Sequence, residues 1–275
     1  MFSYQHRYHA GAFADVHKHL VLVALIKALQ KKPTPFAVLD LLAGEGLYDI
    51  QSKESQKTGE FKQGFSKILA VEHAPTLIQN YIDIIAAYNP TDNKHIYPGS
   101  PGFAVKCLRD NDQLLCVEAH PQAITQLKKH FRRHPQVHIH ERDAYEALKA
   151  LIPFKEKRGL ILIDPSYEVK TEYKDIAKAL KSAFDRFAQG TYAVWYPILP
   201  ENHHQQLLQG IQRSELTKVW YCEWTPLKKA PEKGLQASGM VIVNMPFQVD
   251  RELKDTFAWL NKHVYKQGVF KEGWI

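Results

Sequence analysis

Short apolar runs recur along this chain, and helical segments separate them from one another. The runs cover residues 36–40, 114–118, 137–140, 160–163 and 191–196. The segments between the last four runs have helical spacing of apolar residues and cover residues 121–133, 143–151 and 171–189. Strands that alternate with helices in this way predict a parallel, doubly wound sheet of the Rossmann-like α/β class.

The remaining segments extend this predicted domain at both ends. Residues 15–31 are mostly apolar and predict a buried helix, which Pro33 ends. Residues 216–224 and 240–244 predict an antiparallel hairpin with a long basic loop. Residues 53–98 show helical patterns and no convincing strand. We therefore expect a single domain over residues 1–275, with a helical insertion at 53–98.

The composition predicts a cytoplasmic protein with a sizeable core. The chain has 275 residues, of which 45% are hydrophobic and 24% are charged. No apolar stretch approaches transmembrane length, and the N-terminus lacks the hydrophobic region of a signal peptide, so we expect no membrane partner. The cysteines, Cys107, Cys116 and Cys222, are scattered, which argues against disulfides and against a cysteine-based zinc site.

The net charge of +7 is compatible with a polyanionic partner and also with mere solubility. Basic clusters occur at 31–32, 128–133, 155–158 and 228–233. Each cluster alone is typical of a solvated helix face or loop. Their number favours nucleic acid as the partner.

Acidic residues follow the predicted parallel strands, at the point where each strand ends. Asp40 closes the first run, Glu118 the second and Asp164 the fourth, and Asp143 lies just beyond the third. Ligands of doubly wound sheets bind at the carboxyl ends of the strands, and carboxylates are rarely buried without a partner. The pattern therefore predicts a ligand crevice at this edge of the sheet.

The residues around the crevice favour S-adenosylmethionine as the cofactor. A Gly-x-Gly turn at 43–46 and an acid such as Glu118 serve both this cofactor and dinucleotides. A dinucleotide fingerprint would have a third glycine at position 49, where this chain has Asp49. Acidic residues within and before the turn would repel a pyrophosphate but suit a sulfonium and an amino-acid group. We expect Asp143 to face the adenine amine and Asp164 the transferable methyl.

The sequence Asp164-Pro165-Ser166-Tyr167 suits methylation of an exocyclic amine. The lone pair of such a nitrogen is delocalised into the ring. A carboxylate and a main-chain carbonyl can accept both amine protons, and an aromatic ring can stack on the base. Taken alone, the four residues are more typical of a strand-end turn with a core tyrosine. Cytosine-C5 chemistry would need a cysteine nucleophile, and none lies near Asp164 in the sequence.

Blocks along the whole chain resemble the bacterial RlmJ (YhiR) family of 23S rRNA adenine-N6 methyltransferases, which have the class I methyltransferase fold. The blocks that carry the resemblance are Ser3-Tyr4-x-His6-x2-His9-Ala-Gly11, Ala14-Asp15-x2-Lys18-His19, Leu39-Asp40-x2-Ala43-Gly44-x-Gly46, Thr58-Gly59-Glu60, Tyr97-Pro-Gly-Ser-Pro101, Arg158-Gly-Leu-Ile-Leu-Ile-Asp-Pro165, Trp195-Tyr-Pro197 and Ala237-Ser-Gly-Met240.

The resemblance implies a set of site residues. It implies Asp164 as the catalytic residue. It implies that the cofactor is bound by His19, Leu42, Gly44, Ser100, Glu118, Asp143, Ala144 and Asp164. It implies that the substrate, 23S rRNA with little bound protein, is bound by Tyr4 and Lys18, to which the chemistry of the loop adds Pro165 and Tyr167. We also expect a monomer that acts in rRNA processing and uses no metal.

Two positions depart from the family pattern. Ser166 stands where the family has a second proline, so we expect a less rigid loop that still presents the carbonyl of Pro165. Leu42 stands where the family has histidine, so a polar side-chain contact there is lost.

Other functions share part of these features. A DNA adenine methyltransferase, or an enzyme that methylates a glutamine amide, would have the same four-residue loop, and a non-catalytic RNA-binding module would have the same charge. The N-terminal histidines have no metal-site spacing, but they could titrate near neutrality and add RNA affinity. They are His6, His9, His17 and His19.

Overall fold

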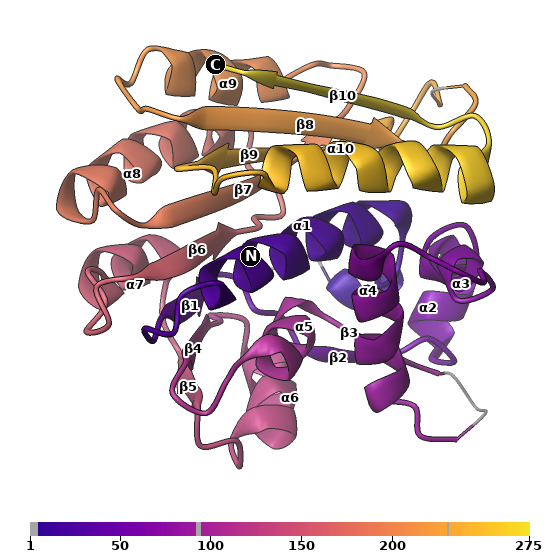
Figure 1. The fold of residues 1–275 in the computed structure, drawn as a ribbon, viewed down its shortest axis with the longest axis horizontal. Helices are drawn as coiled ribbons and strands as arrows, with labels where there is room; N and C mark the ends of the chain where they lie inside the picture. The colour runs from indigo at the N-terminus through magenta and orange to yellow at the C-terminus, as the bar shows by residue number, and fades with distance from the viewer. Residues whose placement is uncertain (1–4, 92–94, 230) are drawn as a thin grey trace.

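The computed structural model describes residues 5–91, 95–229 and 231–275. It contains a central eight-stranded sheet with helices on both faces (Figure 1). In spatial order the strands are β10 (Val269–Trp274), β8 (Val219–Thr225), β9 (Ala237–Val243), β7 (Thr191–Ile198), β6 (Gly159–Ile163), β1 (Ala37–Asp40), β4 (Gln113–Val117) and β5 (Val137–His140).

The sheet has a parallel half and an antiparallel end. Strands β5, β4, β1, β6 and β7 pair in parallel. Strand β9 pairs antiparallel with both β7 and β8, and β10 pairs antiparallel with β8. The predicted doubly wound, class I methyltransferase arrangement with a terminal hairpin is confirmed. Because strand order reverses between β1 and β6, the loops after these two strands diverge and can leave room for a ligand between them.

Strand β6 is apolar at every position because both of its faces are buried. In β6, Leu160 and Leu162 face one core, whereas Ile161 and Ile163 face the other. Helices α1 (Phe13–Gln30), α5 (Ser100–Cys107), α6 (Pro121–Phe131) and α10 (Val249–Leu260) belong to the first core. Helices α7 (Ala144–Leu151), α8 (Glu172–Arg186) and α9 (His204–Gln212) belong to the second.

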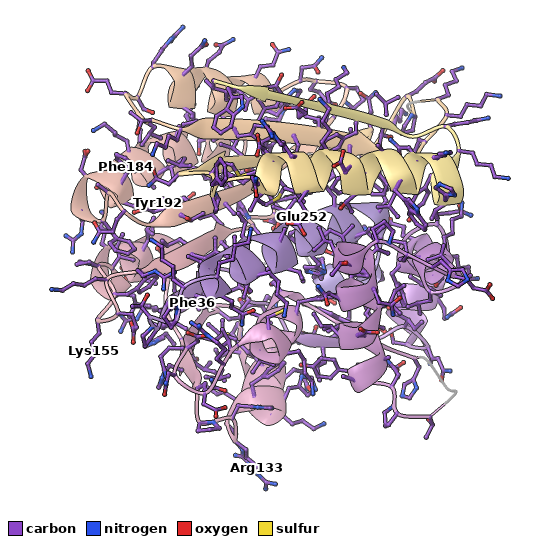
Figure 2. All side chains as sticks on the ribbon, in the orientation of Figure 1. Phe36, Arg133, Lys155, Phe184, Tyr192 and Glu252 are labelled. Atoms are coloured by element: carbon purple, nitrogen blue, oxygen red, sulfur yellow. The ribbon has the colours of Figure 1, made fainter. Side chains whose placement is uncertain are left out.

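The side chains follow the same division between interior and surface. Phe36 and Tyr192 are fully buried within the layers, whereas Arg133 and Lys155 extend into solvent at the margin (Figure 2). Among the described residues, no helix combines the length and the apolarity that a membrane crossing requires.

Helix α1 is enclosed by the rest of the chain. It contacts α4 (Thr76–Ala87), α5, α10, β6 and β9, and residues 15–26 are all buried. The predicted helix at 15–31 is confirmed, and its apolar composition is that of a helix with protein on every side. Four polar residues at its N-terminal end are buried as well: Asp15, His17, Lys18 and His19.

The range 53–98 is mainly helical, as expected, but it also contains a strand. Its elements are α2 (Lys53–Thr58), η2 (Glu60–Lys62), α3 (Phe65–Ile68), α4 and β3 (Ile96–Pro98). Strand β3 pairs antiparallel with β2 (Leu47–Asp49), so the expectation of no strand here is wrong. Elements that the sequence did not predict are η1 (His6–Tyr8), α5, α9, α10, the π-helix η3 (Asn261–Tyr265) and β10.

Candidate active site

The ends of β1 and β4 are tied together by main-chain hydrogen bonds. Ala43 N donates to Val117 O at 2.9 Å, and Gly44 N donates to Glu118 Oε2 at 2.8 Å. The other Glu118 oxygen accepts from His120 N at 2.7 Å. Since a carboxylate has about four acceptor positions, Glu118 can hold this turn and still accept hydroxyl groups of a ligand.

The turn after β1 needs glycine for conformational reasons. Gly44 and Gly46 have φ angles of +60° and +77°, which residues with a Cβ rarely adopt. A Cβ at Gly44 would lie 2.3 Å from the Tyr48 hydroxyl, which accepts a hydrogen bond from Glu45 N. The side chain of Glu45 pairs with Arg7 at 2.8 Å. The turn is therefore held in shape from several sides.

Three loops at the carboxyl ends of the parallel strands meet around one small cavity. Leu42, Ala144 and Pro165 line a space of about 30 Å³ together with Tyr145. These loops follow β1, β5 and β6, so the structure brings together predicted residues more than a hundred positions apart. Leu42 lines the cavity with an apolar side chain, as expected from its departure from the family pattern.

Asp143 has a clear structural task at this edge. It is the N-cap of α7, and its Oδ1 accepts hydrogen bonds from Tyr145 N at 2.8 Å and Glu146 N at 3.0 Å. Such a cap satisfies main-chain donors that the helix leaves unpaired. The side chain is exposed at the crevice, and Oδ2 makes no hydrogen bond within the described part of the chain.

Asp164 is joined to helix α1 by a buried ion pair. Its Oδ2 contacts Lys18 Nζ, which also contacts Asp15 Oδ1 at 2.9 Å. Asp15 Oδ2 in turn lies 2.9 Å from His6 Nε2 and accepts from Gly11 N. We call Asp164, Lys18, Asp15 and His6 the aspartate–lysine network. Oδ1 of Asp164 has no hydrogen bond to any residue that the structure describes, which leaves it available to a ligand.

Burial and mutual attraction act in opposite directions on the charges of this network. Burial alone would lower the pKa of Lys18, but Asp15 and Asp164 outweigh it and raise that pKa. Burial alone would raise the pKa of Asp15, but His6 and Lys18 hold it well below its usual range. Lys18 and Asp15 are therefore both charged near neutral pH.

Two side chains near the network have buried polar atoms without a hydrogen bond, in normal geometry, to any described residue. These atoms are both carboxylate oxygens of Asp40 and Nε2 of His19, whose Nδ1 lies 2.8 Å from the Tyr97 hydroxyl. Burial raises the pKa of Asp40 to about 7, and nearby Asp164 adds to the increase, whereas Ser100 opposes it. Burial also lowers the pKa of His19 well below its usual value. Buried polar atoms of this kind usually bind something.

Tyr167 supports the loop in this structure. It has a φ of +54° and is 8% exposed. Its hydroxyl donates to Trp195 O at 2.6 Å, and its ring centroid lies 4.3 Å from that of Tyr173. The tyrosine thus anchors the residues after Asp164, and its expected stacking on a base stays a prediction.

Other predicted residues are placed as follows. Ser100 is buried at the N-terminus of α5, close to Asp40. Lys18 is 5% exposed and paired with Asp164, and its expected contact with RNA stays a prediction. Tyr4 lies outside the described residues.

The histidines of the N-terminal block have different environments. His17 is buried between Ser238 Oγ at 2.9 Å and Cys222 Sγ at 3.2 Å, and burial lowers its pKa to about 3. The expectation that these histidines gain charge near neutrality is wrong for His17 and His19. In the described part of the chain, no three His, Cys, Asp or Glu side chains are grouped to hold a metal ion.

Asp15 and Trp195 lie at the candidate site and were not predicted as site residues, and His6 was considered only as a side chain that could titrate. Trp195 is half-buried, and its ring centroid lies 6.0 Å from Lys18 Nζ. Its Nε1 donates to Ser238 Oγ at 2.9 Å. All three residues belong to blocks that resemble the RlmJ family, and that resemblance was the signal that could have found them.

Comparison with known proteins agrees with the resemblance. The family model described as "Ribosomal RNA large subunit methyltransferase D, RlmJ" matches residues 33–275. The chain is 33% identical over 268 residues to the Escherichia coli K12 protein "Ribosomal RNA large subunit methyltransferase J". The matched region covers 98% of this chain and 96% of that protein. It is 35% identical over 269 residues to the Haemophilus influenzae protein of the same name, with the same coverage.

A solved structure extends this similarity to three dimensions. A crystal structure of a Legionella pneumophila protein superimposes with a TM-score of 0.90 at 34% sequence identity. The match covers 97% of this chain and 98% of that protein. The fold described above is therefore shared over nearly its whole length.

Proposed function

This chain belongs to the RlmJ family of ribosomal RNA large subunit methyltransferases, and from that membership we propose that it methylates N6 of a specific adenine in 23S rRNA. The family and the fold make it an S-adenosylmethionine-dependent rRNA methyltransferase. The observation that carries the finer proposal is the placement of Asp164. Its carboxylate ends β6 at the topological switch point, with one oxygen held by Lys18.

The proposed chemistry uses the two oxygens of Asp164 differently. Oδ2 stays paired with Lys18, so the carboxylate cannot rotate freely, and Oδ1 accepts one N6 proton of the adenine. The carbonyl of Pro165 accepts the other. Hydrogen bonds to both protons draw the nitrogen toward a pyramidal geometry, in which its lone pair can attack. As the N–CH₃ bond forms, the bond between the methyl group and the cofactor's sulfonium sulfur would break and leave a neutral thioether, and one N6 proton would leave toward Oδ1 and then to solvent.

Several residues at the crevice fit S-adenosylmethionine. Bound there, the cofactor supplies the methyl group from its sulfonium sulfur. Asp40 offers a cationic group a buried carboxylate, and His19 offers a carboxylate a ring nitrogen, Nε2; neither group has a hydrogen-bond partner in normal geometry among the described residues. Glu118 would accept ribose hydroxyls, and Asp143 would accept the adenine amine through Oδ2. Main chain and small side chains would complete the site, at Leu42, Gly44, Ser100 and Ala144.

RNA binding would involve the rim of the crevice. We propose that Tyr4 and Tyr167 contact the target base or its neighbours, and that the segment 53–98 forms a subdomain beside the entrance. Lys18 would act on the substrate through Asp164, and its pairing supports this role better than a phosphate contact. The net charge of +7 favours a polyanionic substrate.

Methyl acceptance tests the proposal directly. The enzyme would be incubated with labelled S-adenosylmethionine and, in separate reactions, naked 23S rRNA, 16S rRNA, tRNA, adenine-containing duplex DNA and intact 50S particles. We expect label in naked 23S rRNA, and N6-methyladenosine after digestion to nucleosides. Label mainly in DNA, tRNA or protein would overturn the rRNA proposal even if Asp164 proved catalytic. Label in 23S rRNA as another nucleoside would overturn the N6 assignment.

A further inference from the structure

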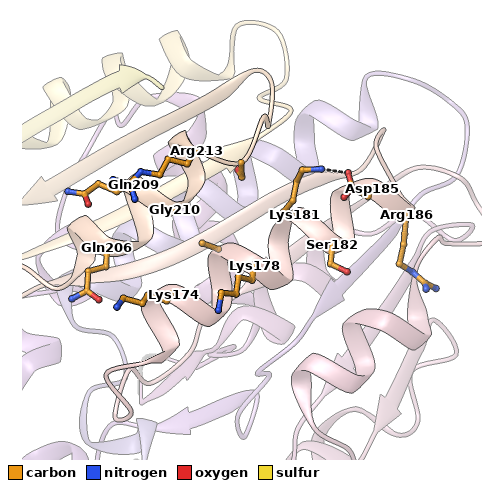
Figure 3. A pocket seen from close by; sticks show the side chains of 12 residues that line it. Lys174, Lys178, Lys181, Ser182, Asp185, Arg186, Gln206, Gln209, Gly210 and Arg213 are labelled. Carbon is orange, nitrogen blue, oxygen red and sulfur yellow. Dashed lines mark hydrogen bonds and ion pairs between the residues drawn. The ribbon is translucent and has the colours of Figure 1, made fainter.

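Helices α8 and α9 run side by side on one face of the sheet and leave an open groove between them (Figure 3). The groove has a volume of about 730 Å³. At its floor the helices touch through small residues, since a Cβ on Gly210 would lie 2.8 Å from Ala177 Cβ. The long side chains on either side therefore form the walls.

The walls carry mostly positive charge. The charged residues that line the groove are Lys174, Lys178, Lys181, Asp185, Arg186 and Arg213. Lys181 pairs with Asp185 at 2.5 Å, and Arg186 donates to Ile152 O at 3.2 Å. Lys174, Lys178 and Arg213 are exposed, and none of them has an ion pair with a described residue. One acid among five cations makes the groove complementary to a polyanion.

The spacing of the cations forms a line along the groove. Lys174, Lys178 and Lys181 follow one another at i, i+4 and i+7 on α8, so they share one face of the helix. At 1.5 Å per residue they lie about 6 Å and about 4.5 Å apart along the helix axis. Arg213 faces them from the end of α9, and the amide of Gln206 lies on the same side (Figure 3). A row of cations with amides opposite suits a chain of phosphates more than a single compact anion.

The groove begins beside the catalytic loop. Helix α8 follows β6 and the Asp164 loop in the chain, and the ring of Tyr173 packs on that of Tyr167 at 4.3 Å. Lys174 is the next residue after Tyr173. A strand of RNA whose target base enters the crevice at Asp164 could therefore continue into the groove without leaving the surface.

We infer that the α8–α9 groove binds the phosphodiester backbone of the substrate RNA beside the target adenine. The inference rests on the proposed function for the class of substrate. Contacts of this kind position the RNA and carry no sequence information. An acidic protein would also suit the charge, but the continuity with the catalytic loop favours the RNA that enters there.

The test compares two triple variants of the full-length enzyme. The groove variant is K174Q/K178Q/R213Q. The control variant is K31Q/K32Q/K106Q, which removes three exposed cations at the end of α1 and on α5, two helices that pack on the other face of the sheet from α8 and α9. Binding of naked 23S rRNA would be measured by filter retention between 50 and 300 mM NaCl. Circular dichroism and calorimetry with S-adenosylmethionine would establish that each variant folds and binds cofactor.

We expect the groove variant to bind RNA about tenfold or more weakly at low salt, with the cofactor affinity unchanged. The slope of log affinity against log salt concentration should be less steep by about 2 to 3, since each phosphate contact that is lost reduces that slope by about 0.7 to 0.9. The KM for RNA should rise with little change in kcat. Equal RNA binding by groove variant, control variant and wild type would overturn the inference while leaving the proposed function intact, and so would equal losses in the two variants. Failure of the wild-type enzyme to bind 23S rRNA would overturn the proposed function first, and the groove inference with it.

Discussion

The aspartate–lysine network and the α8–α9 groove lie on either side of the loop that follows β6, yet they handle charge in opposite ways. In the network Lys18 is 5% exposed and contacts two carboxylates. In the groove Lys174 and Lys178 are exposed and contact none among the described residues. A buried charge without a partner would cost several kcal/mol, whereas an exposed one remains hydrated.

The difference assigns the two regions different tasks. Paired and buried charges are little screened by salt and fix the position of atoms such as Asp164 Oδ2. Unpaired surface charges hold no atom in place, but they attract a polyanion from a distance and act as a sum. We therefore expect changes in the network to affect chemistry and stability, and changes in the groove to affect RNA affinity.

The largest effect should come from Asp164→Ala. Loss of the proposed proton acceptor should lower turnover by about 10²–10⁴-fold, while RNA affinity changes little because it depends on other cations. Single-turnover methylation and filter binding on the same preparation would measure both. Asp164→Asn should retain more activity, since its amide oxygen still accepts one N6 proton. Near-normal turnover by the alanine variant would remove Asp164 from the mechanism.

Asp15→Asn should reveal how strongly the network depends on its central carboxylate. The variant leaves Lys18 with one carboxylate partner and weakens the contacts to His6 and Gly11. Breaking a buried ion pair in this way costs about 3–5 kcal/mol of unfolding free energy. Urea denaturation would measure the loss, with Asp110→Asn, an exposed residue, as the matched control. Equal stability of the two variants would show that Asp15 contributes little.

Asp40 is the intermediate case. It is buried like the network, but its carboxylate has no hydrogen bond in normal geometry to any described residue. Its pKa of about 7 lies above the value near 4 of an unfolded chain. Between these values the folded state holds a proton that the unfolded state has released, so stability falls as pH rises from about 4 to about 7. Relative to Asp40→Asn, the wild type should lose up to about 1.4 kcal/mol per pH unit in this interval.

Denaturant unfolding of the cofactor-free enzyme at pH 5, 6, 7 and 8 checks this expectation. If the unfolding free energies of wild type and Asp40→Asn differed by the same amount at every pH, the raised pKa would be contradicted. The proposed contact with a cationic group of the cofactor adds a second readout. Cofactor affinity should rise with pH over the same interval in the wild type, and the Asn variant should show no such rise from this group.

The smallest effect should come from the groove's own ion pair. Lys181 and Asp185 are separated by one helical turn, with the half-buried lysine on the less favourable N-terminal side and the aspartate exposed. Lys181→Ala should therefore lower the free energy of unfolding by about 0.3 kcal/mol or less, and this loss should vanish in 1 M NaCl. Denaturant unfolding at both salt concentrations would measure it, with Lys178→Ala as a control that lacks the pair. If Lys181→Ala lowered the free energy of unfolding by more than about 1 kcal/mol, charges in the groove would stabilise the fold as those in the network do, against our expectation.

The strands of the parallel half were predictable because their sequence follows directly from their environment. A strand with both faces buried is apolar at every position, as β6 is, and the acids at the strand ends show where the apolar environment stops. Helix α1 was predictable for the same reason. Strand β10 lies at an exposed edge with a single neighbour, so residues 269–274 lack that pattern. Ser100-Pro101-Gly102 is typical of a turn, and in the structure it opens α5.

The pairing of side chains in the site could not be predicted in the same way. The residues of the Lys18–Asp164 pair are 146 positions apart, and neither local spacing nor propensity relates them. Lys18 was identified through the family resemblance alone, and its buried pairing follows only from the packing of α1 against β6. Tyr167 illustrates the same limit, because an aromatic residue after a strand can face a ligand or, as here, another ring.

The enclosure of α1 has a consequence for the order in which the protein can fold during synthesis. His17 contacts Cys222 and Ser238, which are added 205 and 221 residues later. Until then the first α-helix has no β8 or β9 to cover that side, and it exposes apolar surface to the cell's chaperones. Native packing of α1, which carries Lys18, must therefore wait for nearly the whole chain. A ribosome that stalls before the final hairpin would release a polypeptide that contains every proposed catalytic residue but cannot yet assemble them.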